Sequence, residues 1–314
     1  MENNNFNMNN NDLKDLGFFD FVPKGKNQYT SIPFGFKENG IVALDLDEWK
    51  NGGMLTLAED IDEIEALQEA ILLMGCMKYS PDDLRVMAIS KNSSLASNLK
   101  KWDLPHTIST ICVGNYYDFA MALENLLNFI KRRDQKLQIL GKINNIQVEN
   151  IFEFNKIALE DSKNSIAPME RVMVFIDDIY DIIDTASKES DKDEIMERLA
   201  QVIISGKDVG VYLVAGATPR AQLDYKITKS VAPYVSTLGT FRLENGLEAE
   251  LSLGGDLEGH TEDIEGLAKG QLFLVASCEN GKKKSLVKLA KYDTLQREEY
   301  VSAIKDNYFF FQNN

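Results

Sequence analysis

Short apolar runs alternate with longer amphipathic segments from residue 41 to the end of the chain. The short runs are rich in Val, Ile and Leu and are bounded by polar or turn-forming residues, which is typical of buried strands. In the longer segments apolar positions recur every three or four residues, as on one face of a helix. The predicted strands are 41–46, 54–58, 84–90, 107–113, 172–177, 209–216, 237–243, 271–276 and 285–289, and the predicted helices are 61–77, 116–140, 150–161 and 193–206.

This alternation predicts an α/β fold. Near-continuous apolar strands separated by helices form a mainly parallel sheet with helices on both faces. We expect a disordered, asparagine-rich leader over residues 1–16, because it has too few apolar side chains to fold alone. Residues 17–292 are expected to form a single domain, and residues 293–314 a C-terminal helix and tail.

The composition is that of an ordinary globular domain, with 44% hydrophobic and 26% charged residues. No apolar run approaches the roughly 18–20 residues that a membrane span needs. The cysteines Cys76, Cys112 and Cys278 are far apart and odd in number, which favours buried thiols in a reducing cytoplasm over disulfides or zinc. With only His106 and His260, a histidine-based catalytic or metal site is not expected.

The net charge of −15 bears on possible partners. An acidic chain repels the phosphate backbone of nucleic acids unless its basic residues gather on one face. The basic clusters 131–133 and 282–284 are isolated from each other in the sequence. A nucleic-acid partner is therefore not expected.

Residues 171–178 read Arg-Val-Met-Val-Phe-Ile-Asp-Asp, an apolar run that ends in two carboxylates. In a parallel α/β sheet, ligands bind beyond the carboxyl ends of the strands. Nucleotide-driven motors place one aspartate there to hold Mg²⁺ through water, and a second acid to position the attacking water. Asp177 and Asp178 occupy these two positions. The alternative is that both carboxylates only cap the strand and begin the next helix.

The phosphate-binding loop of such a motor, G-x-x-x-x-G-K-[ST], is absent from the sequence. Its place would be between the strand 54–58 and the helix 61–77. The chain has acidic residues there: Glu59, Asp60, Asp62 and Glu63. Asp60 is a candidate N-cap of the helix, with Glu63 completing an arrangement similar to a capping box. The helix start would then be satisfied by the protein's own carboxylates, which also suit the helix dipole.

These carboxylates oppose nucleotide binding. A carboxylate about 5 Å from a phosphate oxygen costs roughly 3 kcal/mol per charge pair at an effective dielectric constant of about 20. Four carboxylates that face a triphosphate, with no lysine to offset them, outweigh the remaining contacts. We therefore expect no bound ATP, no Mg²⁺ and no other metal or cofactor.

A third segment, residues 208–220, contains the predicted strand 209–216 and ends in Ala-Gly-Ala-Thr-Pro-Arg. Thr218 and Arg220 follow the strand, where they could lie beside a γ-phosphate or a partner. The alternative is a core strand that ends in small residues and has no functional role there.

Taken in order, these segments resemble the FtsK/SpoIIIE family of RecA-like motor domains. More narrowly, they are similar to the C-terminal ATPase modules of the type VII secretion ATPases, EssC in Firmicutes and EccC in actinobacteria. The resemblance covers residues 30–292 and rests on the order of loose motifs: residues 32–35 with strand 41–45, the strand ending in Asp177 and Asp178, residues 206–220, residues 225–240, and residues 266–270 near the family's G-R-G. The chain departs from the family in lacking the phosphate loop and in having Lys269 before Gly270, where the family has arginine.

The resemblance implies a RecA-like P-loop NTPase fold with a degenerate phosphate loop, in the cytosolic part of a membrane-anchored ATPase. It implies two kinds of partner: neighbouring ATPase modules, and secreted helical-hairpin proteins of the WXG100 type, whose C-terminal tails carry a Tyr-x-x-x-Asp/Glu signal. The leading hypothesis is a catalytically inactive module that binds protein. The alternative in the enzyme class is an ATPase that uses Asp177 and Asp178 with an unconventional phosphate cradle, and a DNA translocase is a third hypothesis.

Overall fold

The computed structural model describes residues 31–38, 40–46, 52–91, 94–161, 166–219, 227, 229–278, 281–290 and 292–312; Arg220 and the predicted leader 1–16 lie outside this set. The strands are β1 (Ser31–Lys37), β2 (Gly40–Asp45), β3 (Gly53–Leu57), β4 (Leu84–Ser90), β5 (Thr107–Cys112), β6 (Arg171–Ile176), β7 (Val211–Ala217), β8 (Thr237–Thr240), β9 (Gln271–Cys278) and β10 (Gly281–Leu289). The helices are α2 (Ile61–Lys78), α3 (Ser94–Trp102), α4 (Tyr116–Ile143), α5 (Ile151–Glu160), α6 (Ile179–Ile183), α7 (Glu189–Gly206), α9 (Leu247–Leu253), α10 (Thr261–Glu265) and α11 (Thr294–Gln312). None of the described helices is both long enough and apolar enough to cross a membrane.

The strands form one 10-stranded sheet in the order β2-β1-β10-β9-β8-β3-β7-β6-β4-β5. From β8 to β5 in this order the neighbours run parallel. The pairs β8–β9, β9–β10, β10–β1 and β1–β2 are antiparallel. The short connection between β9 and β10 requires this arrangement, because only antiparallel strands can be joined by a hairpin. The predicted α/β fold with a mainly parallel sheet is confirmed, and an antiparallel half extends it.

Three differences from the predicted elements have local causes. The apolar pattern does not predict β1, because Pro33 and Gly35 are poor strand residues, and the β1–β2 register shifts between them. The strand predicted to begin at residue 209 begins at Val211, since residues 207–209 form a 3-10 turn and Gly210 has a φ of 71°. The helix predicted from residue 193 begins at Glu189, because its polar first turn shows no apolar periodicity.

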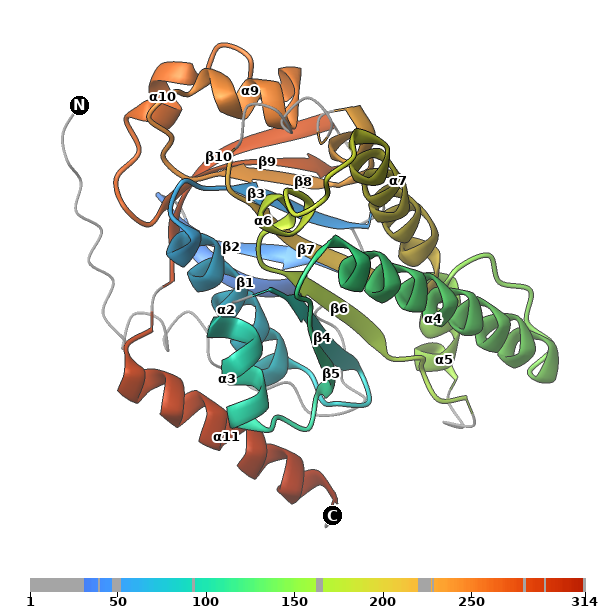
Figure 1. Cartoon of the computed structure of the whole chain (residues 1–314). Coiled ribbons are helices and arrows are strands. Elements are labelled where there is room, and N and C mark those ends of the chain that lie inside the picture. The colour runs from blue at the N-terminus through green and yellow to red at the C-terminus, as the bar shows by residue number, and fades with distance from the viewer. Residues whose placement is uncertain are drawn as a thin grey trace.

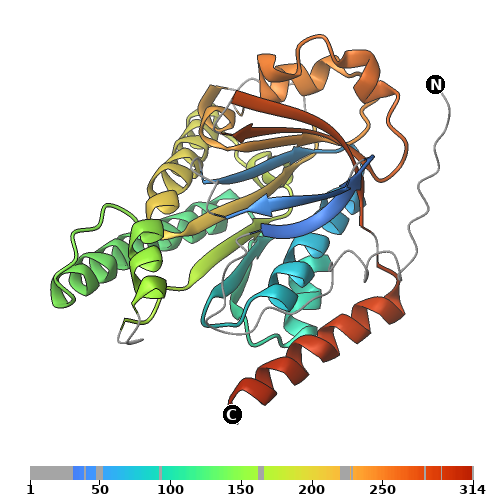
Figure 2. The same ribbon diagram turned by 180° about the vertical axis from the view of Figure 1, so that it is seen from behind.

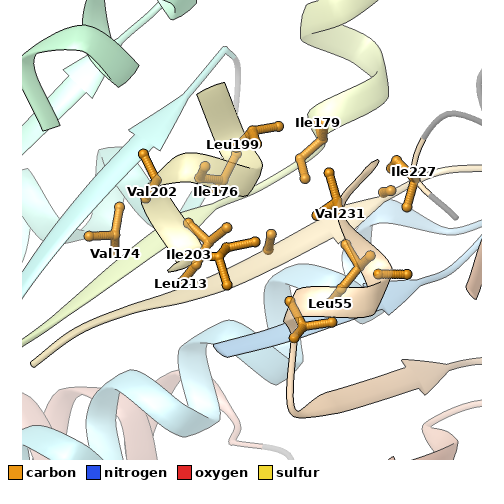
Figure 3. Close-up of a cluster of buried hydrophobic side chains, with 14 of the residues drawn as sticks. Leu55, Val174, Ile176, Ile179, Leu199, Val202, Ile203, Leu213, Ile227 and Val231 are labelled. Carbon is orange, nitrogen blue, oxygen red and sulfur yellow. The ribbon is translucent and has the colours of Figure 1, made fainter. Parts of the chain in front are cut away.

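Helices cover both faces of the sheet (Figures 1 and 2). On one face, α4, α6 and α7 bury a core that includes Val174, Leu199, Ile203 and Leu213 (Figure 3). On the other face, α2 and α3 bury a second core around Phe175, and α11 packs against α2. The adjacent residues Val174 and Phe175 of β6 therefore face opposite cores, as expected for a strand that is buried on both sides.

His106 gives the fold a defined response to acid. Its side chain is 1% exposed, and Nε2 lies 2.7 Å from the carbonyl oxygen of Tyr79. Burial lowers the pKa of His106 from 6.5 to about 4, because the protonated ring would lose its hydration. Between these two pH values the unfolded chain binds more protons than the folded protein, so stability falls as the pH drops through this window.

We expect His106 to account for a loss of up to about 3 kcal/mol in the free energy of unfolding as the pH falls from about 7 to about 4. Urea denaturation at both pH values measures this loss, and the His106→Phe variant should lack it. The matched control is His260→Phe, which changes a histidine whose side chain is 27% exposed and should keep the loss. An equal loss in the His106→Phe variant would contradict the assignment.

Candidate functional site

The strands β3, β7, β6 and β4 end side by side beneath the first turn of α2. They are parallel neighbours whose final residues are in register. This register places Thr56, Gly216, Asp177 and Ser90 in one row across the carboxyl end of the sheet. A Cβ atom on Gly216 would meet Ile64 of α2, so the row faces that helix. In an α/β sheet of this kind, this edge is where a ligand is expected.

Asp177, the first of the two carboxylates that follow β6, is buried, and one of its two side-chain oxygens has a hydrogen-bond partner. Its residue is 6% exposed, and its Oδ2 accepts a hydrogen bond of 2.8 Å from the hydroxyl of Ser90. Its Oδ1 is buried with no hydrogen-bond partner. Burial raises the pKa of Asp177, and the hydrogen bond from Ser90 opposes this shift. An orphan carboxylate oxygen at this depth is costly and needs an explanation.

Asp178, the second carboxylate, accepts hydrogen bonds from the protein through both of its side-chain oxygens. It is the N-cap of α6, where its Oδ1 accepts from the backbone N–H groups of Tyr180 at 2.9 Å and Asp181 at 3.2 Å. The same oxygen accepts from the backbone N–H of Thr218 at 3.1 Å, and Oδ2 accepts from the Thr218 hydroxyl. Asp178 therefore ties the exit of β6 to the exit of β7. Asp178 thus caps α6, and its side chain has little acceptor capacity left to orient a water.

The connection that replaces the phosphate loop is short. β3 ends at Leu57 and α2 begins at Ile61, so Ala58, Glu59 and Asp60 alone join them. The motif G-x-x-x-x-G-K-[ST] has eight positions and needs a longer excursion around a phosphate group. Asp60 is the N-cap of α2, as predicted, because its Oδ1 accepts from the backbone N–H of Asp62 at 3.0 Å.

The acidic side chains of this connection are held by donors from the other end of the chain. Oε1 of Glu59 accepts from the backbone N–H of Glu244. Oδ2 of Asp60 forms an ion pair of 3.2 Å with the ammonium of Lys269, which raises the pKa of that lysine. Glu63, which was assigned to the cap of its own helix, accepts through Oε1 from the backbone N–H of Gly270 at 2.8 Å. The expectation that no lysine offsets these carboxylates is wrong, because Lys269, which is distant in the sequence, pairs with Asp60 in the fold.

We tested whether these residues fit a nucleotide and its Mg²⁺, which the fold class implies. The N–H of Asp62 is taken by the Asp60 side chain, and the N–H of Glu63 bonds the carbonyl oxygen of Asp60 at 3.0 Å. A Cβ on Gly216 would lie 2.2 Å from Cγ2 of Ile64, so α2 rests directly on the strand ends. Among the described residues, no group of three or more His, Cys, Asp or Glu could hold a metal ion. The residues do not fit a triphosphate bound at this helix start.

A pocket of about 190 Å³ lies beside the acidic connection and was not found from the sequence. Its lining includes Glu63, Lys269, Glu69 of α2, and Arg297 of α11. Oε1 of Glu69 accepts a hydrogen bond of 2.6 Å from Nε of Arg297. Burial raises the pKa of Glu69, and the ion pair with Arg297 opposes the shift. The sequence offers no local signal for this contact, because α2 also carries Asp62, Glu63 and Glu65 and nothing in it distinguishes Glu69.

A second concavity, of about 510 Å³, lies between α4 and the start of α7. Tyr117 and Met121 line it and are 66% and 65% exposed. Charged residues of both signs line the same concavity, and Arg198 of α7 is paired there with Glu194 at 2.7 Å and with Glu124 of α4 at 3.5 Å. This groove combines apolar and charged groups in the way that peptide-binding grooves do.

Neither a protein-family model nor a curated protein sequence matches this chain. Solved structures do. The cytoplasmic domain of the type VII secretion ATPase EccC from Thermomonospora curvata has a TM-score of 0.67 and 17% identity over 91% of this chain. The chain has the RecA-like fold of such an ATPase module. ATPases 2 and 3 of EssC from Geobacillus thermodenitrificans match with a TM-score of 0.63 and 15% identity over 92% of the chain.

The EccC-like and EssC-like fold is one unit of larger proteins. The chain spans 32% of the EccC structure and 51% of the EssC structure. The conjugation coupling protein TcpA of pCW3, solved with ATPγS, matches with a TM-score of 0.60 and 15% identity over 91% of this chain and 74% of its own. The fold is therefore shared between proteins that bind nucleotide and a chain whose helix start does not fit one.

We expect Asp178→Ala to lower the free energy of unfolding by about 2 kcal/mol, because it removes an N-cap and the link to Thr218. Urea denaturation measures the change. Thr218→Val should cost less alone and almost nothing in the Asp178→Ala background, since its partner is then missing. Additive losses in the double variant would show that the two side chains act independently.

Proposed function

We propose that this chain is a RecA-like module of a type VII secretion ATPase that has lost nucleotide hydrolysis and binds protein. The observation that carries the proposal is the acidic connection between β3 and α2, whose carboxylates are held by Glu244, Lys269 and Gly270. These contacts fix acidic side chains around the helix start at which a motor of this fold would bind phosphate, and Asp60 itself accepts from the N–H groups of Asp62 and Glu63 there. The fold that the chain shares with EccC and EssC supports the secretion context.

The partners in this proposal are proteins. ATPases 2 and 3 of EccC from Thermomonospora curvata, solved in complex with a signal sequence peptide, match this chain with a TM-score of 0.59 and 17% identity. By analogy, the module binds C-terminal tails of secreted WXG100-type proteins and contacts neighbouring ATPase modules on the cytosolic side of the membrane. The groove between α4 and α7, with Tyr117 and Met121 exposed, is a candidate for holding such a tail.

A second candidate function, weak ATP hydrolysis, has one observation in its favour. Oδ1 of Asp177 is buried without a partner, at the position where a motor holds Mg²⁺ through water. A cation held there would satisfy the oxygen. The acidic connection opposes this reading, because each carboxylate repels the nucleotide that would bring the metal ion.

We expect no saturable heat when the chain is titrated with Mg²⁺-ATP in an isothermal calorimeter, since protein groups already fill the helix start. The comparison variant carries Glu59→Lys and Asp62→Lys, which reverse exposed charges of the connection. Binding by this variant alone would identify the acidic side chains as the obstacle. Saturable micromolar binding by the unaltered chain would overturn the proposal and favour the ATPase.

We also expect Asp177→Ala to leave the affinity for a secreted-protein tail within about twofold of the unaltered chain, because in this proposal the carboxylate no longer serves a motor cycle. Fluorescence anisotropy with a labelled tail peptide measures the affinity. The matched comparison is Met121→Glu, which places a charge in the groove between α4 and α7 and should weaken binding at least tenfold. A large loss of affinity in a folded Asp177→Ala protein would refute this prediction.

A further inference from the structure

The helix α11 is held to the rest of the protein by few buried side chains. Among residues 294–307, whose side chains the structure describes, Ile304 alone is fully buried, at 1% exposed. Tyr300, Val301 and Ala303 pack against the same core but are partly exposed. The neighbouring α2, by comparison, buries 13 of its 18 residues. In both views α11 lies along the outside of the molecule (Figures 1 and 2). An element with so few buried contacts opens locally at a lower free energy than the core does.

The start of α11 is capped by its own residues. Oδ1 of Asp293 accepts from the backbone N–H of Gln296 at 2.8 Å, and Oε1 of Gln296 accepts from the backbone N–H of Asp293 at 3.0 Å. This reciprocal pair is a capping box, which satisfies two donors at the helix start without help from other elements. What holds α11 in place is therefore its contact with α2.

The contact between α11 and α2 is incompletely packed. The pocket of about 190 Å³ lies where they meet, and its lining includes Ala66 and Glu69 of α2, Tyr292, and Arg297 of α11. The hydroxyl of Tyr292 is buried and has no hydrogen-bond partner among the described residues. A pocket forfeits the attractive contacts that close packing gives, and a buried hydroxyl without a partner loses its hydration. Both features weaken the docking of α11.

The same contact contains an ion pair that is largely removed from water. The side chains of Glu69 and Arg297 are 11% and 28% exposed. Burial raises the pKa of Glu69, and the pair with Arg297 opposes this shift without cancelling it. The cost of removing two charges from water can exceed their attraction. The other titratable groups around this carboxylate are Glu65, Tyr292, Tyr300 and, along the pocket, Asp62, Glu63 and Lys269.

Proton binding by Glu69 is therefore linked to the docking of α11. In the docked helix the carboxyl has a raised pKa, and on release it returns to water and to its ordinary value of 4.5. The docked state thus binds the proton more tightly than the released state does. Docking is favoured most below pH 4.5 and weakens as the pH rises through the raised pKa.

We propose that α11 is a displaceable arm over the pocket, which leaves α2 without unfolding of the sheet, and that the charge of Glu69 sets how often it does so. Release removes Arg297 from the pocket and opens the side of α2 that carries Ala66 and Glu69, next to the acidic connection. This inference goes beyond the proposed function and does not rest on it, because it involves neither a nucleotide nor a secreted protein.

Amide hydrogen exchange of the full chain, followed by mass spectrometry, tests the arm. A released helix of 19 residues is marginal in water, so its amides exchange while those of the sheet stay protected. We expect peptides from α11 to exchange faster than peptides from α2 and β6. The opening constant of α11, corrected for the intrinsic pH dependence of exchange, should rise severalfold from about pH 5 to about pH 8. Equal protection of α11 and β6 at both pH values would overturn the proposal.

The variant Glu69→Gln tests the role of the charge, because it keeps the shape and an acceptor for Arg297. We expect its opening constant for α11 at about pH 8 to fall severalfold and to lose its pH dependence, the reverse of what loss of a stabilising ion pair gives. The control Glu298→Gln removes the same charge at an exposed position of α11 and should leave the opening unchanged. His106 titrates alike in all these chains, so its effect cancels. Faster exchange of α11 in Glu69→Gln would refute the charge control.

A second variant, Arg297→Gln, leaves Glu69 charged and without its partner. The opening constant of α11 at about pH 8 should rise severalfold in this variant. In the Glu69→Gln background the same change should have little effect, because no buried charge remains to be paired. Equal effects in both backgrounds would show that Arg297 acts through packing alone, and they would overturn the charge control.

Discussion

The arrangement of the candidate site depends on the close approach of α2 to the carboxyl ends of the parallel strands. Gly216 has no side chain, and the Ile64 side chain fills the space that one would take, close to the carbonyl oxygen of Asp177. The short connection from β3 makes this approach possible, because Ala58, Glu59 and Asp60 leave no length for a detour. In a nucleotide-binding module of the same fold, a loop and a phosphate group separate helix and strands. Here direct apolar packing takes their place, and the row of polar residues below it is sealed from solvent.

Because of this packing, the adjacent carboxylates Asp177 and Asp178 differ in how many hydrogen bonds they accept. Asp178 lies where β6 ends and accepts hydrogen bonds from the start of α6 and from Thr218, so it caps α6. Asp177 points into the row beneath α2 and has Ser90 for one oxygen alone. Its raised pKa means that folding is opposed by its charge at neutral pH and favoured when it is protonated. Its second oxygen stays buried without a hydrogen-bond partner, in contrast to both oxygens of Asp178.

Features that depend on neighbouring residues could be predicted from the sequence, and contacts between residues far apart in the sequence could not. Strands such as β4 and β6 were predicted because continuous apolar runs can only be buried on both sides. The N-cap role of Asp60 was predictable too, since a cap acts within its own first turn. The contact between Asp60 and Lys269 joins residues 209 positions apart, and no periodicity encodes it. The same holds for Ser90 beside Asp177, for the contact of Arg297 with Glu69, and for the short helices α3, α6, α9 and α10, which are too brief to show a period.

The order of strands has a consequence for how the chain folds. β1 pairs with β2 on one side and with β10 on the other, so the first strands of the sheet reach its body only through the last one. Until β9 and β10 have been synthesised, the β1–β2 hairpin can pack on α2 but β1 lacks its partner strand β10. The parallel half can assemble earlier, around β3, β7 and β6. Contacts of such high sequence separation are slow to form, and the unpaired side of β1 is an exposed strand edge in the meantime. The antiparallel half is therefore the last part of the sheet to close.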